Sequence, residues 1–148
     1  MAATGNTARI ERALMYRLST LTLSPTRRIA QPGQDFTPVA GEIYLAPGFL
    51  WNSTERGEVG SQSARRYIGI FQIAVRGPAI ANVEPQTEVA DAFIDHFDRQ
   101  VITRESVTVR IGSFNGGRSV PWRGSAIIEG GWRLVPVSVP FWCDIFPS

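Results

Sequence analysis

The sequence predicts a single α+β domain over residues 1–148, with two amphipathic helices, four to five strands and long loops. Two observations favour this class: apolar residues recur at helical spacing in two separate stretches, and they alternate along several others. The chain has 148 residues, of which 43% are hydrophobic and 19% are charged. This composition is typical of a folded domain with one core, and no repeat or linker divides the chain.

The first predicted helix lies near the amino terminus, where apolar residues recur at spacings of four, four and three. They are Ile10, Leu14, Leu18 and Leu21. Arginines between them supply the polar side of an amphipathic helix. Asn6 or Thr7 is expected to cap the first turn, because their side-chain oxygens can accept a hydrogen bond from the backbone.

A second helix is predicted around Pro85, which a first helical turn tolerates, with Val89, Phe93 and Phe97 at four-residue spacing. Five acidic residues recur along one side of it: Glu84, Glu88, Asp91, Asp95 and Asp98. A solvated or salt-bridged face is the simplest interpretation of this stripe. Two others stay open, namely oxygen ligands for a divalent cation and an acidic wall that repels DNA inside a ring.

Five stretches are predicted as strands: residues 41–46, 65–76, 107–111, 125–129 and 132–141. The second is apolar on both faces and is expected to lie inside the sheet. Gly130-Gly131 predicts a hairpin turn before the last strand. Pro136 and Pro140 share one register of that strand, and because proline cannot donate to a ladder they predict an edge position.

Two segments without a clear period are predicted as long loops, residues 49–63 and the glycine-rich residues 112–124. Large apolar side chains fall within both: Phe49, Leu50, Trp51, Phe114 and Trp122. Such side chains in loops often mark subunit contacts. The alternative is that they fold back as a lid over the edge of the sheet.

Few residues suit catalysis or cofactor binding. His96 is the only histidine and follows Asp95 on the second helix, so a triad stays open but a partly exposed helix histidine is favoured. Cys143 is the only cysteine, which excludes an intrachain disulfide and a cysteine-rich metal site. The glycine pairs lack the lysine and hydroxyl residue of a phosphate-binding loop. We expect no enzymatic activity, no cofactor and no catalytic or metal-binding residue.

Charge and hydropathy limit the classes of partner expected for the chain. All fifteen basic residues are arginine, and the formal net charge is +2. The pairs Arg27-Arg28 and Arg65-Arg66 are too short for a basic tract, so sequence readout of nucleic acid is not expected. No stretch reaches the roughly 18 apolar residues of a membrane span, and no hydrophobic segment follows the polar amino terminus. We expect a cytoplasmic protein without membrane contact.

Five stretches follow one another in a recognisable order. They are the helix beginning Ala8-Arg9-Ile10, the strand 42–45 followed by Trp51 and Glu55-Arg56, the segment 66–73 leading to Gly77, the helix 90–97, and the closing strand 131–141. In this order the chain resembles the tail-terminator and minor tail proteins of bacteriophages with long, noncontractile tails. The resemblance spans the chain from about residue 8 to residue 141.

The resemblance implies a mixed, mostly antiparallel sheet with two helices packed on it. It also implies a structural virion protein that forms a ring, of six subunits, at the head-proximal end of the tail tube. The ring would end tube polymerisation and form part of the head-to-tail joint. Its partners would be further copies of itself, the tube protein and a head-completion or stopper protein, with DNA passing non-specifically through the lumen. Assembly would take place in the host cytoplasm.

Within that resemblance, residues are predicted for two surfaces. Subunit or tube contacts are expected at Phe49, Leu50, Trp51, Arg56, Arg65, Phe114, Arg118, Trp122 and Arg123. Glu88, Asp91 and Asp95 are expected to face the lumen or an arginine of a neighbouring subunit. A stopper or head-completion subunit, or the tube protein itself, is the alternative role.

Overall fold

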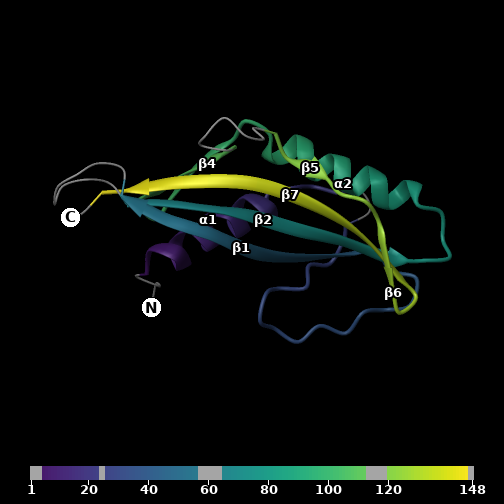
Figure 1. Cartoon of the computed structure of the whole chain (residues 1–148). Helices are drawn as coiled ribbons and strands as arrows, with labels where there is room; N and C mark the ends of the chain where they lie inside the picture. Colours follow the sequence, from purple (N-terminus) through teal and green to yellow (C-terminus); the bar gives the residue numbers. More distant parts are fainter. Residues whose placement is uncertain (1–4, 24–25, 57–64, 113–119, 147–148) are drawn as a thin grey trace.

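The computed structural model describes residues 5–23, 26–56, 65–112 and 120–146, with the side chains of residues 53–56 excepted. Two helices and seven strands follow one another along these residues (Figure 1). They are α1 (Asn6–Ser19), β1 (Tyr44–Arg56), β2 (Arg65–Pro78), α2 (Glu84–Phe97), β3 (Val101–Arg104), β4 (Val107–Ile111), β5 (Trp122–Arg123), β6 (Ile127–Glu129) and β7 (Trp132–Ile145).

The strands form one sheet in the order β1-β2-β7-β4-β3, with β5 and β6 also paired to β7. Every pair of neighbouring strands is antiparallel. The predicted fold class was therefore wrong, because the chain forms a seven-stranded antiparallel sheet and not a mixed α+β sheet of four to five strands. Among the described residues, parallel pairing is confined to an isolated bridge between Ile29 and Leu45.

Both helices lie where the spacing of apolar residues predicted them. The predicted cap of α1 was wrong, because its N-cap is Gly5, without a side-chain hydrogen bond. The Asn6 amide instead donates to the Tyr67 hydroxyl on β2, at 3.0 Å. The Asn6 side chain thus makes a tertiary contact in place of the local capping hydrogen bond that was predicted.

β1 replaces part of the loop predicted for residues 49–63. Its side chains alternate regularly up to Trp51, and a bulge at Asn52 then shifts the alternation by one residue. The strand predicted for residues 41–46 continues through Pro47. The backbone of Leu45 bonds to Arg28 and Ala30 on the side away from β2. Pro47, two residues on, presents its missing N–H to the same outer edge.

β7 lies in the middle of the sheet, so the edge position predicted from its prolines was wrong. β2 pairs with one side along its whole length, while β4, β5 and β6 share the other side. Pro140 lies between the residues paired with β4 and β5, and Pro136 between those paired with β5 and β6. The carbonyls of Pro140 and Pro136 accept from Gly112 and Gly124 on that side. Their missing N–H groups therefore face the junctions between short partner strands.

Both helices cover the same face of the sheet. α1 packs on β3 and β4, and α2 on β7, β2 and β5. Their apolar sides merge with the inward residues of β2, β4 and β7 in one cluster, whose largest buried members include Ile10, Leu14, Phe71, Phe93, Phe97 and Phe141. The outward residues of β2 alternate with the buried ones and are half-buried.

The Gln86 side chain connects the first turn of α2 to the sheet by hydrogen bonds. Its side chain is buried, and its Nε2 donates to the Val75 carbonyl at 3.0 Å and to the Arg133 carbonyl at 2.8 Å. Its Oε1 accepts from the Arg133 guanidinium at 3.2 Å. One amide thus joins α2 to the end of β2 and the start of β7, and no local pattern predicts a buried polar residue at this position.

Replacing Gln86 with methionine, which has similar length and no N–H, should lower the free energy of unfolding by about 2 kcal/mol. The physical reason is that two buried carbonyls would lose their donor. Urea titration followed by circular dichroism measures the change. Glu84→Gln on the exposed side of the same turn should change it by less than about 0.5 kcal/mol. An equal loss in both variants would contradict the role given to Gln86.

Candidate functional site

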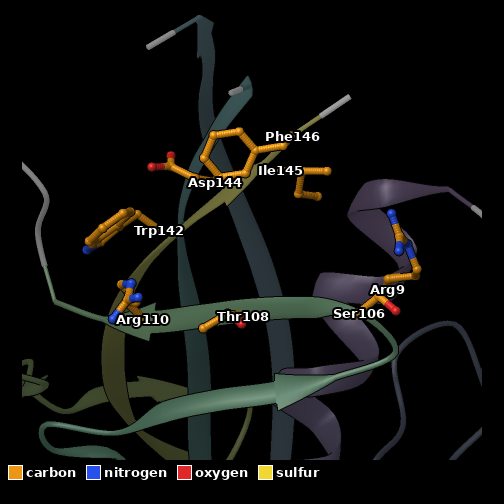
Figure 2. Close-up of a pocket in the computed structure, with 8 residues that line it drawn as sticks. All are labelled: Arg9, Ser106, Thr108, Arg110, Trp142, Asp144, Ile145 and Phe146. Carbon is orange, nitrogen blue, oxygen red and sulfur yellow. The ribbon is translucent and has the colours of Figure 1, made fainter. Parts of the chain in front are cut away.

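A pocket of about 780 Å³ lies where β7 ends (Figure 2). It is bounded by the first turn of α1, the β3–β4 turn, β4 and the last residues of β7. Its lining residues are Arg9, Ser106, Thr108, Arg110, Trp142, Asp144, Ile145 and Phe146. We call this site the arginine pocket, because guanidinium groups supply its positive charge.

Arg9 and Arg110 lie at the two ends of the arginine pocket, with Ser106 and Thr108 between them along the β4 side (Figure 2). Arg9 is fixed by two hydrogen bonds, from Nη1 to the Glu105 carbonyl at 3.1 Å and from Nη2 to the Asn6 side chain. Glu105 and Ser106 both have positive φ, as a tight two-residue hairpin turn requires. This turn therefore sets where the Arg9 guanidinium is held.

Trp142 forms the aromatic wall of the arginine pocket. The guanidinium carbons of Arg66 on β2 and Arg110 on β4 lie 5.5 and 5.6 Å from its ring centroid. Both distances are in the range of cation–π attraction. The register explains the arrangement, because Trp142 stands opposite Ile68 on one side and Arg110 on the other.

Asp144 is the one carboxylate among the described lining residues, and Arg66 already neutralises it. Two parallel hydrogen bonds of 2.8 Å join the Arg66 guanidinium to the two oxygens of Asp144. The fork geometry is the strong form of this pairing. Arg9 and Arg110 make no ion pair among the described residues. The arginine pocket therefore presents net positive charge to its contents.

These groups suit recognition of an anionic oxygen group more than catalysis. Two guanidinium groups and two hydroxyls can donate hydrogen bonds, and Phe146, with 69% of its surface exposed, adds an apolar rim. His96 is not among the described lining residues, so it does not serve as a base for the Ser106 or Thr108 hydroxyl. Within the described ranges, no group of three or more acidic, histidine or cysteine residues is arranged to hold a metal ion.

His96 joins the carboxyl ends of the two helices. Its Nε2 donates to the Arg17 carbonyl at 2.8 Å, and the Arg17 guanidinium donates back to the His96 carbonyl at 2.7 Å. Partial burial lowers the pKa of the imidazole below its usual value, and this outweighs the rise that the hydrogen bond to the Arg17 carbonyl would cause. The triad that the sequence left open is thus replaced by a structural contact between helices.

Since His96 has a lower pKa in the folded than in the unfolded chain, its neutral form stabilises the fold above the unfolded pKa of about 6.5. That stability should be lost as the pH falls through this value towards the folded pKa. His96→Gln keeps an N–H donor but does not titrate. We therefore expect the free energy of unfolding of this variant, relative to that of the parent, to rise when the pH is lowered from 8 to 5. Urea unfolding at both pH values measures the difference, and an unchanged difference would contradict the assignment.

The predicted aromatic loop is part of β1, and two of its three large residues pack on the core. Phe49 stacks on Phe71 at 4.9 Å. The Trp51 ring lies edge-on to Phe141, and its Nε1 donates to Glu11 of α1 at 2.9 Å. Neither the exposed loop nor the lid predicted for these side chains is found. Leu50, on the other face, has 52% of its surface exposed.

The remaining predicted contact residues that the structure describes lie on two different strands. Arg65 is exposed at the start of β2, and Arg123 of β5 donates to the Thr87 hydroxyl at 3.2 Å. Trp122 of β5 is half-buried. The side chain of Arg56, and Phe114 and Arg118 as a whole, lie outside the described residues. The role of these residues as contacts stays a prediction.

The acidic stripe on α2 faces solvent. Glu84, Glu88, Asp91 and Asp95 are exposed, and Asp98 follows the helix as its half-buried C-cap. We call the four exposed residues the acidic face of α2. Whether it borders a lumen or a neighbour stays a prediction.

The arginine pocket was not predicted from the sequence. Arg110 could have been placed on the outward side of its strand, because Val109 and Ile111 flank it. Its neighbours could not, since Trp142 and Asp144 reach the site through the register of β7 with β2 and β4. Arg9 reaches it from a helix whose other side was correctly read as buried.

Comparison with known proteins gives the context of this site. A family model described as "Phage tail terminator protein" matches residues 9–141. A solved structure with 25% sequence identity is similar over 94% of this chain and 96% of that one, with a TM-score of 0.71. None of the curated proteins matches the chain. Neither described helix is long and apolar enough to cross a membrane. The resemblance seen in the sequence is confirmed by the family model.

Proposed function

The chain belongs to the phage tail terminator family, and from this premise we propose that it forms a ring, of six subunits, that caps the head-proximal end of the tail tube. Its role is structural, and its place is the tail of the virion. The ring ends polymerisation by covering the last layer of tube protein, and its other side forms part of the joint with the head. DNA passes through its lumen without sequence readout.

One observation carries the proposal: the family model covers 133 residues, 9–141, which include nearly the whole sheet and both helices. The chemistry of the arginine pocket agrees with a binding role, since its described lining offers guanidinium and hydroxyl donors beside apolar surface. A closed ring of identical subunits uses a heterologous interface, in which each copy shows two different patches. Leu50 and Phe146 are exposed apolar candidates for contacts with a neighbour or with the tube.

A terminator should act at far less than one chain per tube subunit, because one ring is enough to stop one tube. We expect purified chain added to polymerising tube protein of the same phage to arrest the rise in light scattering substoichiometrically. Negative-stain electron microscopy should show a single ring on one end of each tube. Addition to tail-less heads is the control.

Two results would overturn this proposal in favour of another member of the tail and neck machinery. If the chain alone grows into long cylinders, it is a tube subunit. If it binds tail-less heads and leaves tube growth unchanged, it is a stopper or head-completion subunit.

A further inference from the structure

None of the four residues of the acidic face of α2 makes an ion pair within the described part of the chain. Glu84, Glu88, Asp91 and Asp95 repeat at spacings of four, three and four, so each stands beside another like charge. Asp95 also lies near the carboxyl end of α2, where the helix dipole disfavours negative charge. This surface would be stabilised by a cationic partner from outside.

The arginine pocket, by contrast, has an excess of positive charge. Its carboxylate is held by Arg66, which leaves Arg9 and Arg110 without acidic partners among the described residues. The Nε of Arg9 is buried and has no acceptor there. An unsatisfied buried donor costs free energy that a nearby anionic acceptor can reduce.

The start of the acidic face and the arginine pocket lie at opposite ends of the sheet, and no ion pair joins the two sites within the described part of the chain. Gln86, in the first turn of α2, bonds to the Arg133 carbonyl near the start of β7, whereas Trp142 and Asp144 of the arginine pocket are near its end. Nine residues of extended strand separate Arg133 from Trp142, about 30 Å. Figure 1 shows the same separation, with β6 and the start of α2 at one end and the end of β7 at the other.

The spacing of the charges also matches. From Ser106, beside the Arg9 guanidinium, to Arg110 the chain runs four residues of near-extended backbone, about 13 Å. Carboxylates two turns apart on a helix, such as Glu88 and Asp95, are separated by about 10 Å. Flexible acidic and arginine side chains span the difference. A helix face with carboxylates at this repeat can therefore engage both ends of the arginine pocket at once.

We propose that the arginine pocket of one subunit binds the acidic face of α2 of the next subunit around the ring. This inference rests on the proposed function, because it supplies the two unlike patches that a closed ring needs. A helix carrying several carboxylates is favoured over DNA as the occupant, because two unpaired arginines form no tract that follows a phosphate backbone. The acidic face of α2 is a helix surface of this kind, and every copy of the chain carries it.

The experiment uses two oppositely reversed variants of the full chain. Arg110→Glu makes the arginine pocket less basic. The double variant Glu88→Arg/Asp91→Arg reverses one carboxylate in each pair that lies two turns apart, which are Glu84 with Asp91 and Glu88 with Asp95. All three positions are exposed, so both variants should keep the circular dichroism spectrum and urea midpoint of the parent. Arg104→Glu and the double variant Asp35→Arg/Glu129→Arg, at exposed positions outside both sites, are the controls with matching changes in charge.

Each reversed variant alone should need at least about tenfold more protein to arrest tube growth, since like charges then meet at every contact. An equimolar mixture should restore arrest to within about threefold of the parent. The reason is that the two variants can alternate around an even-numbered ring, with opposite charges at each contact. Sedimentation velocity of the mixture should show association at concentrations where each variant alone stays monomeric.

Several outcomes would overturn the proposal. Folded variants that cap tubes as the parent does would remove the contact but leave the proposed function intact. Loss in both variants without restoration in the mixture would show that the two surfaces are not partners. Capping that is unchanged while Arg110→Glu loses retention of a short duplex DNA in a filter assay would make the arginine pocket a phosphate site. If the parent fails to cap tubes, the proposed function falls, and mixed-variant sedimentation still decides the contact.

Discussion

The ladder between β2 and β7 is the interaction on which the rest of the molecule depends. Fourteen residue pairs join the two strands. The inward side of this ladder provides Phe71 and Phe141, against which the apolar sides of α1 and α2 gather in one cluster. Its two ends carry the polar contacts that position other parts: Gln86 bonds at one end, and Arg66 with Asp144 at the other. A change in the register of this ladder would therefore move the helices and the arginine pocket together.

Local patterns in the sequence were enough for the helices, for β2 and for the hairpin between β6 and β7. Each is encoded within a short window, by apolar spacing or by Gly130-Gly131, whose positive φ angles suit a two-residue turn. The fold class failed because β3, β5 and the later part of β1 are defined by their partner strands. Two-residue β5 has no period to detect, and the bulge at Asn52 interrupts the alternation of β1.

The candidate site was harder to predict than the fold for a related reason. Its groups come from Arg9, from the β3–β4 turn and from the last residues of β7, which are far apart in sequence. The aromatic segment 49–51 looked exposed because its hydrophobic side chains were read without a partner strand. Once β1 pairs with β2, Phe49 and Trp51 belong to the core. The acidic side of α2, by contrast, is a local pattern, and it was found from spacing alone.

The prolines of β7 have a consequence for how this chain reaches its native pairing. At Pro136 and Pro140 the backbone has a carbonyl but no donor, and both positions coincide with gaps between β4, β5 and β6. A slip of β7 by two residues would keep its apolar side inward but would set a proline against a strand that needs a donor. Mispaired intermediates are thereby penalised by hydrogen bonds they cannot form. Pro136 and Pro140 thus select among registers that the hydrophobic pattern alone would leave nearly equal in energy.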